Sequence, residues 1–333
     1  MLTIGINFRT GFEPDRPLYE QIEQSAELAR FAAGLGAYHE LRVPHRWLSS
    51  PPVLEPMLLL ARLAPDAAPM RLMVSVMKPP LHNPVDLAQQ VVTLDHICNG
   101  RLDFGVGLGW PQEEFEAAGF PQRLRVPRFV ESLRLMKQLW TGEEVTFEGR
   151  FWSVHGVRMG MTPLQKPYPP LWVGARSVPA SERAARVADG LVFASQTSWQ
   201  DAATATDAYH AELARVGRAG RLGVEREISV APTYEAAAAG AMRQRVVRAT
   251  AFMNTRDRSG SPVVHTAESP GVDPRDWAIV GTPEDCLEQI GRWRERLGMD
   301  YVGLALASWP KEQAARKEQL HYLSETVLQR IPV

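Results

Sequence analysis

The sequence predicts an α/β domain, a (β/α)8 barrel that spans residues 1–333. Short apolar runs alternate along the whole chain with longer segments whose apolar residues recur at helical spacing. Eight such runs are present, and parallel strands joined by right-handed helical connections close into a barrel at that number. An open, doubly wound sheet is the alternative that the same alternation allows.

The expected strands and helices follow one another in strict order. The strands are Leu2–Phe8, Tyr38–Val43, Leu72–Met77, Leu102–Leu108, Pro170–Gly174, Leu191–Ala194, Ile228–Pro232 and Tyr301–Ala307. The helices are Leu18–Leu35, Leu54–Leu63, Pro84–Cys98, Val126–Trp140, Ala180–Ala188, Asp201–Val216, Ala236–Phe252, Glu284–Leu297 and Ala314–Gln329. The first helix, for example, places Ile22, Ala26, Ala29 and Ala33 on one face.

Two segments interrupt this alternation. Residues Thr141–Pro169 are rich in Gly, Pro and aromatic residues, which favours either an extra hairpin or surface decoration. Residues Arg256–Trp277 contain Gly, Ser and Pro throughout, and a stretch of that length is typical of a lid or a disordered loop. It follows the seventh expected strand, at the end of the barrel where such enzymes place their substrate-facing loops.

Composition argues against several classes of protein. The formal net charge is −1, so neither nucleic acid nor an acidic membrane is expected as a partner. No window approaches the roughly 18 uncharged apolar residues of a membrane span, and we expect a soluble, cytoplasmic protein. Cys98 and Cys286 form no CxxC pair, which indicates buried thiols in a reducing compartment. The eight histidines show no metal-binding spacing, so no metal site is expected.

Glycine recurs at every second position from the fourth expected strand onward. Within a strand, Gly105, Gly107 and Gly109 would point to one side and leave a flat strip against which a planar ring could lie. A tight barrel interior that needs small residues is the alternative interpretation. Trp110 stands where the dinucleotide-binding fingerprint requires a third glycine, so that motif is not met.

A second turn of small residues joins the fifth expected strand to its helix. The turn Gly174-Ala175-Arg176-Ser177 precedes a helix whose first turn carries Pro179. Free N–H groups at a helix N-terminus bind anions, and Arg176 and Ser177 would add charge and a hydroxyl. The alternative is an ordinary turn in which Ser177 is a structural N-cap.

Two histidines are candidates for moving protons. His45 follows the second expected strand, at the mouth of the barrel, and His265 lies in the expected lid. Either could serve as an acid or a base near neutral pH, and a surface or structural role is the alternative for each.

Several blocks of sequence resemble the luciferase-like monooxygenase family. They are His82–Gln90, Thr93–Asp95, Asn99–Leu102, Gly105–Trp110, Gly119–Phe120, Pro170–Ser177, Ala188–Gly190 and Gly281–Glu284. The blocks occur in the family's order over most of the chain. In two places the chain departs from the family pattern. Pro44 precedes His45 where many relatives have an acidic residue, and Ala175 follows Gly174 where a second glycine is frequent.

The resemblance implies a barrel with flavin mononucleotide (FMN) or the deazaflavin F420 at its C-terminal face. It implies a cis peptide against the ring at the end of the third strand, which falls on Ser75-Val76. It also joins the two glycine-containing runs into one site, with Gly107 and Gly109 near the ring. The cofactor's phosphate would lie against Gly174, Ala175, Arg176 and Ser177, with Arg125 or Arg128 as a second cation.

The function that the resemblance implies is that of an oxidoreductase. The leading expectation is a two-component monooxygenase, in which a separate reductase supplies reduced FMN. Oxygen would then form a flavin peroxide that attacks a small organic substrate, with His45 or His265 handling the proton. An F420-dependent hydride transfer without oxygen is the alternative, and a non-catalytic flavin-binding protein is a third. The resemblance further implies a homodimer.

Overall fold

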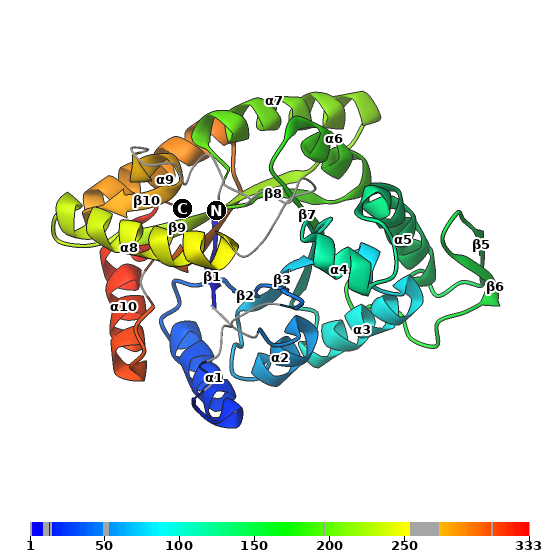
Figure 1. Cartoon of the computed structure of the whole chain (residues 1–333), viewed down its shortest axis with the longest axis horizontal. Coiled ribbons are helices and arrows are strands. Elements are labelled where there is room, and N and C mark those ends of the chain that lie inside the picture. Colours follow the sequence, from blue (N-terminus) through cyan, green and yellow to red (C-terminus); the bar gives the residue numbers. More distant parts are fainter. Residues whose placement is uncertain are drawn as a thin grey trace.

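Eight parallel strands form a closed barrel, and the helices surround it (Figure 1). The computed structural model describes residues 2–8, 13, 15–48, 53–195, 197–253, 273–307 and 309–332, with the backbone alone for 244–253. The barrel strands are β1 (Thr3–Asn7), β2 (Glu40–Val43), β3 (Arg71–Met77), β4 (Leu102–Val106), β7 (Leu171–Ala175), β8 (Gly190–Phe193), β9 (Arg221–Val230) and β11 (Tyr301–Leu306). Pairing of β8 with β9 closes the barrel, which excludes the open sheet.

Each expected helix is present, within a few residues of its expected bounds. The helices are α1 (Leu18–Gly34), α2 (Pro56–Leu63), α3 (Pro84–Ile97), α5 (Arg125–Leu139), α6 (Val178–Val187), α7 (Trp199–Val216), α8 (Tyr234–Met253), α9 (Pro283–Leu297) and α10 (Gln313–Thr326). Their starts follow from capping chemistry. The Asn83 side chain accepts a hydrogen bond from Val85 N at 2.9 Å, and Thr282 and Asp285 form a capping box at the start of α9. Within the described part of the chain, no helix is both long and apolar enough to cross a membrane.

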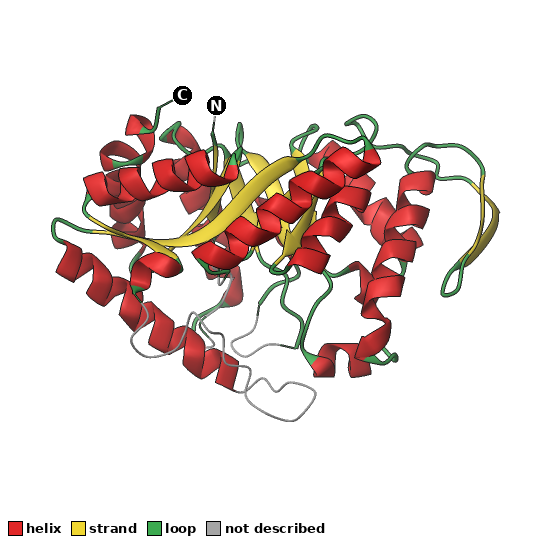
Figure 2. Cartoon of the chain, turned by 90° about the horizontal axis from the view of Figure 1, so that it is seen from above, coloured by secondary structure: helices red, strands yellow, loops and turns green. Residues whose placement is uncertain are grey.

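The excursion after α5 is a hairpin, as one of the two interpretations predicted. Strands β5 (Val145–Glu148) and β6 (Ser153–Val157) pair antiparallel and project from the side of the molecule (Figures 1 and 2). The Glu131 carboxylate on α5 fixes its turn, since it accepts hydrogen bonds from Phe151 N at 2.7 Å and Trp152 N at 2.9 Å.

Three features differ from the expectations. The fourth strand ends at Val106 instead of Leu108, and a short helix, α4 (Gln112–Ala117), follows it. Strand β9 begins at Arg221, seven residues before the predicted start at Ile228. The predicted start is too late because Glu225, Arg226 and Glu227 interrupt the apolar pattern. A ninth parallel strand, β10 (Ala278–Gly281), pairs with the last residues of β9. Of the expected lid, only residues 273–277 are described, and they include the 3₁₀ turn Pro274–Asp276.

Large side chains fill the barrel interior where facing strands carry glycine. A Cβ atom at Gly303 would overlap Nη1 of Arg42, and one at Gly5 would overlap the hydroxyl of Tyr301. A Cβ at Gly223 would lie 2.8 Å from Cδ1 of Tyr301, which is also too close. Small residues opposite large ones are how a barrel of this size packs without voids.

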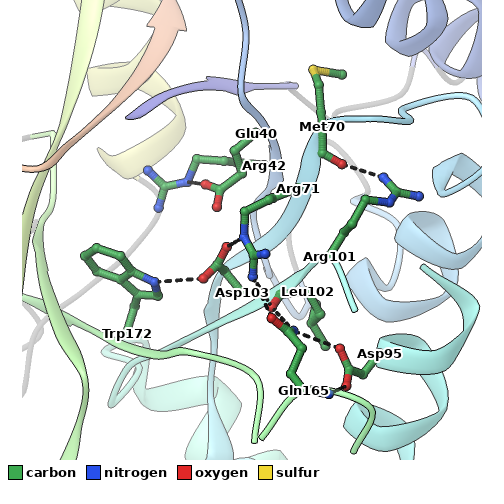
Figure 3. A network of polar contacts seen from close by, with 10 residues as sticks. All are labelled: Glu40, Arg42, Met70, Arg71, Asp95, Arg101, Leu102, Asp103, Gln165 and Trp172. Atoms are coloured by element: carbon green, nitrogen blue, oxygen red, sulfur yellow. Dashed lines mark hydrogen bonds and ion pairs between the residues drawn. The ribbon is translucent and has the colours of Figure 1, made fainter. Parts of the chain in front are cut away.

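A polar network closes the N-terminal end of the barrel (Figure 3). Asp103 pairs with Arg71 and accepts a hydrogen bond from Trp172 Nε1 at 3.2 Å. The Gln165 amide donates to Leu102 O at 2.6 Å and to Asp95 at 2.8 Å. The loop that follows the hairpin is thereby fastened to both β4 and α3.

Replacing Gly303 with Ala tests this packing. We expect Gly303→Ala to lower the free energy of unfolding by roughly 3 kcal/mol, because its methyl group displaces a buried guanidinium from its carboxylate partner. Gly291→Ala is the matched control: Gly291 is exposed within α9 with no atom near its Cβ position, so stability should rise by about 0.5–1 kcal/mol. Urea denaturation measures both changes. Equal stability of Gly303→Ala and the unaltered protein would contradict the packing argument.

Glu40 gives a pH-dependent prediction. Burial, together with the nearby Asp103 carboxylate, raises the pKa of Glu40 from 4.5 to about 8. The folded state therefore holds a proton that the unfolded chain releases, and this stabilisation is complete below pH 4.5 and is lost as the pH rises to about 8. Relative to Glu40→Gln, the unaltered protein should lose up to about 1.4 kcal/mol of unfolding free energy per pH unit across that window. A difference between the two proteins that stays constant with pH would refute this.

Candidate functional site

The barrel is closed at its N-terminal end and accessible at its C-terminal end. Inward-facing side chains of the lower barrel are at most 2% exposed; they are Glu40, Arg42, Asp103, Trp172 and Tyr301. Higher along their strands, Ser75 and Val76 are partly exposed, and the side chain of Glu225 is 20% exposed. A side chain inside a closed barrel can meet solvent only through an end. Ser75, Val76 and Glu225 therefore form the floor of the C-terminal mouth, where barrel enzymes place their active sites.

The peptide between Ser75 and Val76 is cis, as the resemblance implied. The side chain of Val76 occupies the space that two glycines leave. A Cβ atom at Gly107 would lie 2.6 Å from Cγ2 of Val76, and one at Gly174 would lie 3.1 Å from Cγ1. These glycines thus bring β4 and β7 close to the cis peptide of β3.

The glycine strip does not form as expected. The strand ends at Val106, so the three glycines do not line one face of it, and Gly109 turns away with a φ of 74°. Gly105 packs against the backbone of Val74 inside the barrel, as the small-residue interpretation predicted. The space beside Gly107 is filled by the protein's own Val76, and that beside Gly109 by Lys78 and Phe115. The three glycines therefore do not form a flat strip along one strand, and contact of Gly107 and Gly109 with a cofactor stays a prediction.

The turn before α6 has the features of an anion site. Ser177 is the N-cap residue of α6, but its side chain makes no capping hydrogen bond, so the purely structural role for its hydroxyl is not realised. Arg176 and Ser177 are both exposed, and Gly174 and Ala175 end the strand that leads to them. The first backbone N–H groups of α6 point toward this turn, where the helix dipole also has its positive end.

Arg183 on α6 has two arginine neighbours, of which Arg186, in the last turn of the helix, is paired with Glu212 at 2.6 Å. Burial, and then the guanidinium groups of Arg186 and Arg125, lower the pKa of Arg183 on α6. The Nε atom of Arg183 is buried and has no hydrogen-bond partner among the described residues. An anion bound here would relieve the repulsion and satisfy that donor. Sequence reasoning missed Arg183, although it lies two turns into the helix that Ser177 begins.

The two candidate second cations, Arg125 and Arg128, lie in different surroundings. The guanidinium of Arg128 lies over the ring of Phe120 at 4.2 Å and over that of Trp152 at 4.7 Å, and it donates to Pro80 O at 3.3 Å. Arg128 is thus already engaged by the hairpin and the loop before α3. Arg125 instead lies near enough to Arg183 to affect its pKa.

A buried ion pair lies beside His45 at the mouth. Lys78, directly after β3, pairs with Glu114 on α4, and Glu114 also accepts a hydrogen bond from Trp47 N at 3.1 Å. The rings of His45 and His82 lie 5.5 Å apart. Burial, then the positive charge of Lys78 and the neighbouring His82, lower the pKa of His45 to about 3. His45 is therefore a neutral imidazole at physiological pH, able to donate and accept hydrogen bonds but not to deliver a proton as a cation.

His265, the other candidate, lies outside the described residues, and its role stays a prediction. Sequence reasoning also missed Lys78, Arg42 and Glu225, and it named Glu113 or Glu114 only as part of the family resemblance, without a role. Each is a charged residue in or next to a buried element, and only its partner from a distant segment explains its burial. A search of the described residues finds no group of three or more His, Cys, Asp and Glu side chains that could hold a metal ion.

Comparison with known proteins identifies the family. The family model described as luciferase-like monooxygenase matches residues 2–301. The chain belongs to the luciferase-like monooxygenase family. Among curated family relatives, an uncharacterized protein of Mycobacterium tuberculosis is 34% identical over 56% of this chain and 62% of its own length. An FMNH2-dependent dimethylsulfone monooxygenase of Pseudomonas putida is 28% identical over 65% of this chain and 56% of its own length. The alignments thus span less than two thirds of these relatives.

Several solved structures share the fold. The monooxygenase RslO1 of Streptomyces bottropensis superimposes with a TM-score of 0.84, at 24% identity over 99% of this chain and all of its own. The oxygenating constituent of 3,6-diketocamphane monooxygenase from Pseudomonas putida, in complex with FMN, gives 0.81 at 17% identity over 100% and 99%. An F420-dependent tetrahydromethanopterin reductase of Methanopyrus kandleri gives 0.76 at 16% identity over 99% of each chain.

The electrostatics of His45 lead to a prediction. By NMR, the imidazole signals of His45, assigned with His45→Gln, should not titrate between about pH 5 and pH 8. Because its pKa is lowered in the folded state, His45 stabilises the fold fully above pH 6.5, and that stability is lost as the pH falls towards about 3. Lys78→Met should raise the pKa of His45, since it removes a nearby positive charge. A titration of His45 near pH 6.5 in the unaltered protein would contradict this account.

Proposed function

We propose that the protein is an FMN-dependent monooxygenase that receives reduced FMN from a separate reductase. The observation that carries the proposal is the accessible floor of the barrel mouth, formed by Ser75, Val76 and Glu225, in a chain of the luciferase-like monooxygenase family. The crowded arginines and the uncapped hydroxyl beside α6 support it, because they suit the phosphate of a mononucleotide. The relationship to an FMNH2-dependent monooxygenase favours FMN over F420.

The residues present fit such a cofactor. An anion would satisfy the buried donor of Arg183 and would offset the repulsion from Arg125 and from Arg186, which is itself paired with Glu212. Ser177, Arg183 and Arg125 would hold the phosphate, while Arg176 lies at the exposed edge of the same turn. At the other end, Val76 presents an aliphatic side chain at the mouth, where it can pack against a planar ring. When bound, reduced flavin supplies the electrons that activate oxygen.

The remaining contacts position groups around the ring. The Lys78–Glu114 ion pair ties the end of β3 to α4, and through Trp47 N it also holds the loop that carries His45. The neutral His45 side chain can then keep one hydrogen-bond arrangement across the physiological pH range. The neutral ring can donate or accept a hydrogen bond at a reacting group, whereas its lowered pKa disfavours the proton-transfer role first considered for His45.

Cofactor choice is tested by binding and reactivity. We expect FMN, and more strongly reduced FMN under anaerobic conditions, to bind as measured by absorbance and fluorescence titration. Mixing the reduced complex with oxygen should give reoxidation at a rate different from that of free reduced FMN. Tight binding of F420 without binding of FMN would overturn the proposal in favour of hydride transfer. Binding of FMN with reoxidation identical to that of free flavin would favour a non-catalytic flavoprotein.

The phosphate site yields a prediction of its own. Arg183→Met and Ser177→Ala should each weaken FMN binding by roughly tenfold or more, the effect of losing a hydrogen bond to a charged group. Riboflavin has no phosphate, so its weaker binding should be unaffected by either change. Arg296→Met, which removes an exposed arginine paired with Asp207, is the control and should leave both affinities unchanged. Equal losses of FMN and riboflavin binding would place the phosphate elsewhere.

A further inference from the structure

An ion pair lies directly beneath the cis peptide. Arg42 on β2 points into the barrel, its side chain is fully buried, and its guanidinium lies 2.7 Å from the Glu225 carboxylate on β9. The guanidinium also lies over the ring of Tyr301, at 5.0 Å from its centroid. Its Nη1 atom has no hydrogen-bond partner among the described residues.

The chain is built around this guanidinium. Gly303 leaves the space that Nη1 occupies, and a Cβ at Gly5 would lie 3.1 Å from Cδ of Arg42. Two neighbouring strands, β11 and β1, thus carry glycine at the positions that contact the Arg42 side chain. Burying a charge is unfavourable unless a partner compensates it, and the Glu225 carboxylate stabilises Arg42 in this position.

Ser75 connects the ion pair to the cis peptide. Its Oγ accepts a hydrogen bond from Arg42 and donates one to Glu225. Ser75 and Glu225 are reached by solvent from the mouth, whereas Arg42 lies below them. A ligand on the floor would therefore contact the hydroxyl and the carboxylate and would experience the guanidinium at short range.

In the lower barrel the other charges are either compensated or absent at neutral pH, and Glu227, two residues beyond Glu225 on β9, is buried at 1% exposure. Asp103 is paired with Arg71 at the closed end. Glu40, whose Oε1 atom lies 3.8 Å from Arg42 Nε, is largely protonated at neutral pH because burial and Asp103 raise its pKa. Among the described inward-facing residues, Arg42 and Glu225 therefore form the ion pair that lies against the floor of the barrel mouth.

We propose that Arg42 and Glu225 are positioning residues for the ring cofactor, and that the balance of their charges sets its preference for the reduced form. The inference rests on the proposed function. The pair holds the Ser75 side chain at the cis peptide, and the guanidinium attracts the negative charge that the ring gains on reduction. The carboxylate opposes that attraction, so the two charges act in opposite directions.

The experiment compares dissociation constants for oxidised and reduced FMN, measured by anaerobic titration in four variants and the unaltered protein. Glu225→Gln removes the negative charge and keeps the shape, so reduced FMN should gain roughly tenfold in affinity relative to oxidised FMN. Arg42→Met removes the positive charge and should shift the ratio roughly tenfold the other way. The double variant removes both charges, and its ratio should return close to that of the unaltered protein.

Ser75→Ala is the fourth variant and separates positioning from charge. The hydroxyl is uncharged, so its loss should weaken both forms of FMN together and leave their ratio unchanged. Glu148→Gln on the exposed hairpin is the control for loss of a distant carboxylate and should change neither constant. If Arg42→Met does not fold, Glu225→Gln decides the question, because its side chain is isosteric and partly exposed.

Several outcomes would overturn the inference. Shifts of the same sign in Glu225→Gln and Arg42→Met would indicate a structural role alone, as would an unchanged ratio in Glu225→Gln. A shifted ratio in Ser75→Ala would show that charge is not the variable. Failure of the proposed function is distinguishable, because it would appear in the unaltered protein as no binding of either form of FMN. If F420 binds instead, its oxidised and reduced forms replace FMN in the same comparison.

Discussion

A fully buried guanidinium at the centre of the barrel constrains the strands around it. Arg42 needs space, a carboxylate and a hydroxyl, and three different strands provide them. Gly303 on β11 gives the space, Glu225 on β9 gives the charge and Ser75 on β3 gives the hydroxyl. None of these requirements is local in sequence, since the partners lie 33 to 261 positions from Arg42. The packing of glycine against large side chains elsewhere in the interior follows the same logic.

The same interior explains why the site lies at one end only. Toward the strand N-termini, Asp103, Arg71 and Trp172 satisfy one another and leave that end closed. Toward the C-termini, the ladder between β3 and β4 is interrupted after Val74, where the cis peptide occurs. A floor of Ser75, Val76 and Glu225 results, polar on one side and aliphatic on the other.

The fold could be predicted from the sequence because it depends on patterns within single segments. Eight strands were recognisable, as were helices such as α3, whose cap residue Asn83 and apolar spacing are local features. The early part of β9 was missed because its charged residues resemble a solvent-exposed loop in the sequence. Their burial depends on partners from other strands, which a single segment does not reveal. The cis peptide could be placed only through family resemblance, since nothing in the local sequence of β3 demands it.

The candidate site was harder to predict, and the glycine run shows why. An alternating glycine pattern indicates that another group lies close to the strand, but it does not identify whether that group is a ligand, a side chain or a backbone. Here the neighbour of Gly107 is Val76, a side chain of the adjacent strand. Sequence reasoning predicted a close approach correctly but left open whether a ligand or the packing of the barrel interior caused it.

Two groups of arginines in this protein illustrate how charge distinguishes structure from binding. Arg42 is buried deeper than Arg183, yet its charge is compensated by Glu225, so its position is stable without any ligand. Arg183 is crowded by Arg186 and Arg125, and the pKa of its guanidinium is lowered, not raised. Like charges close together around a buried donor are unfavourable in the protein alone, even though Arg186 is paired with Glu212, and a bound anion would offset them. The contrast supports assigning Arg183 to cofactor binding and Arg42 to the permanent structure beneath it.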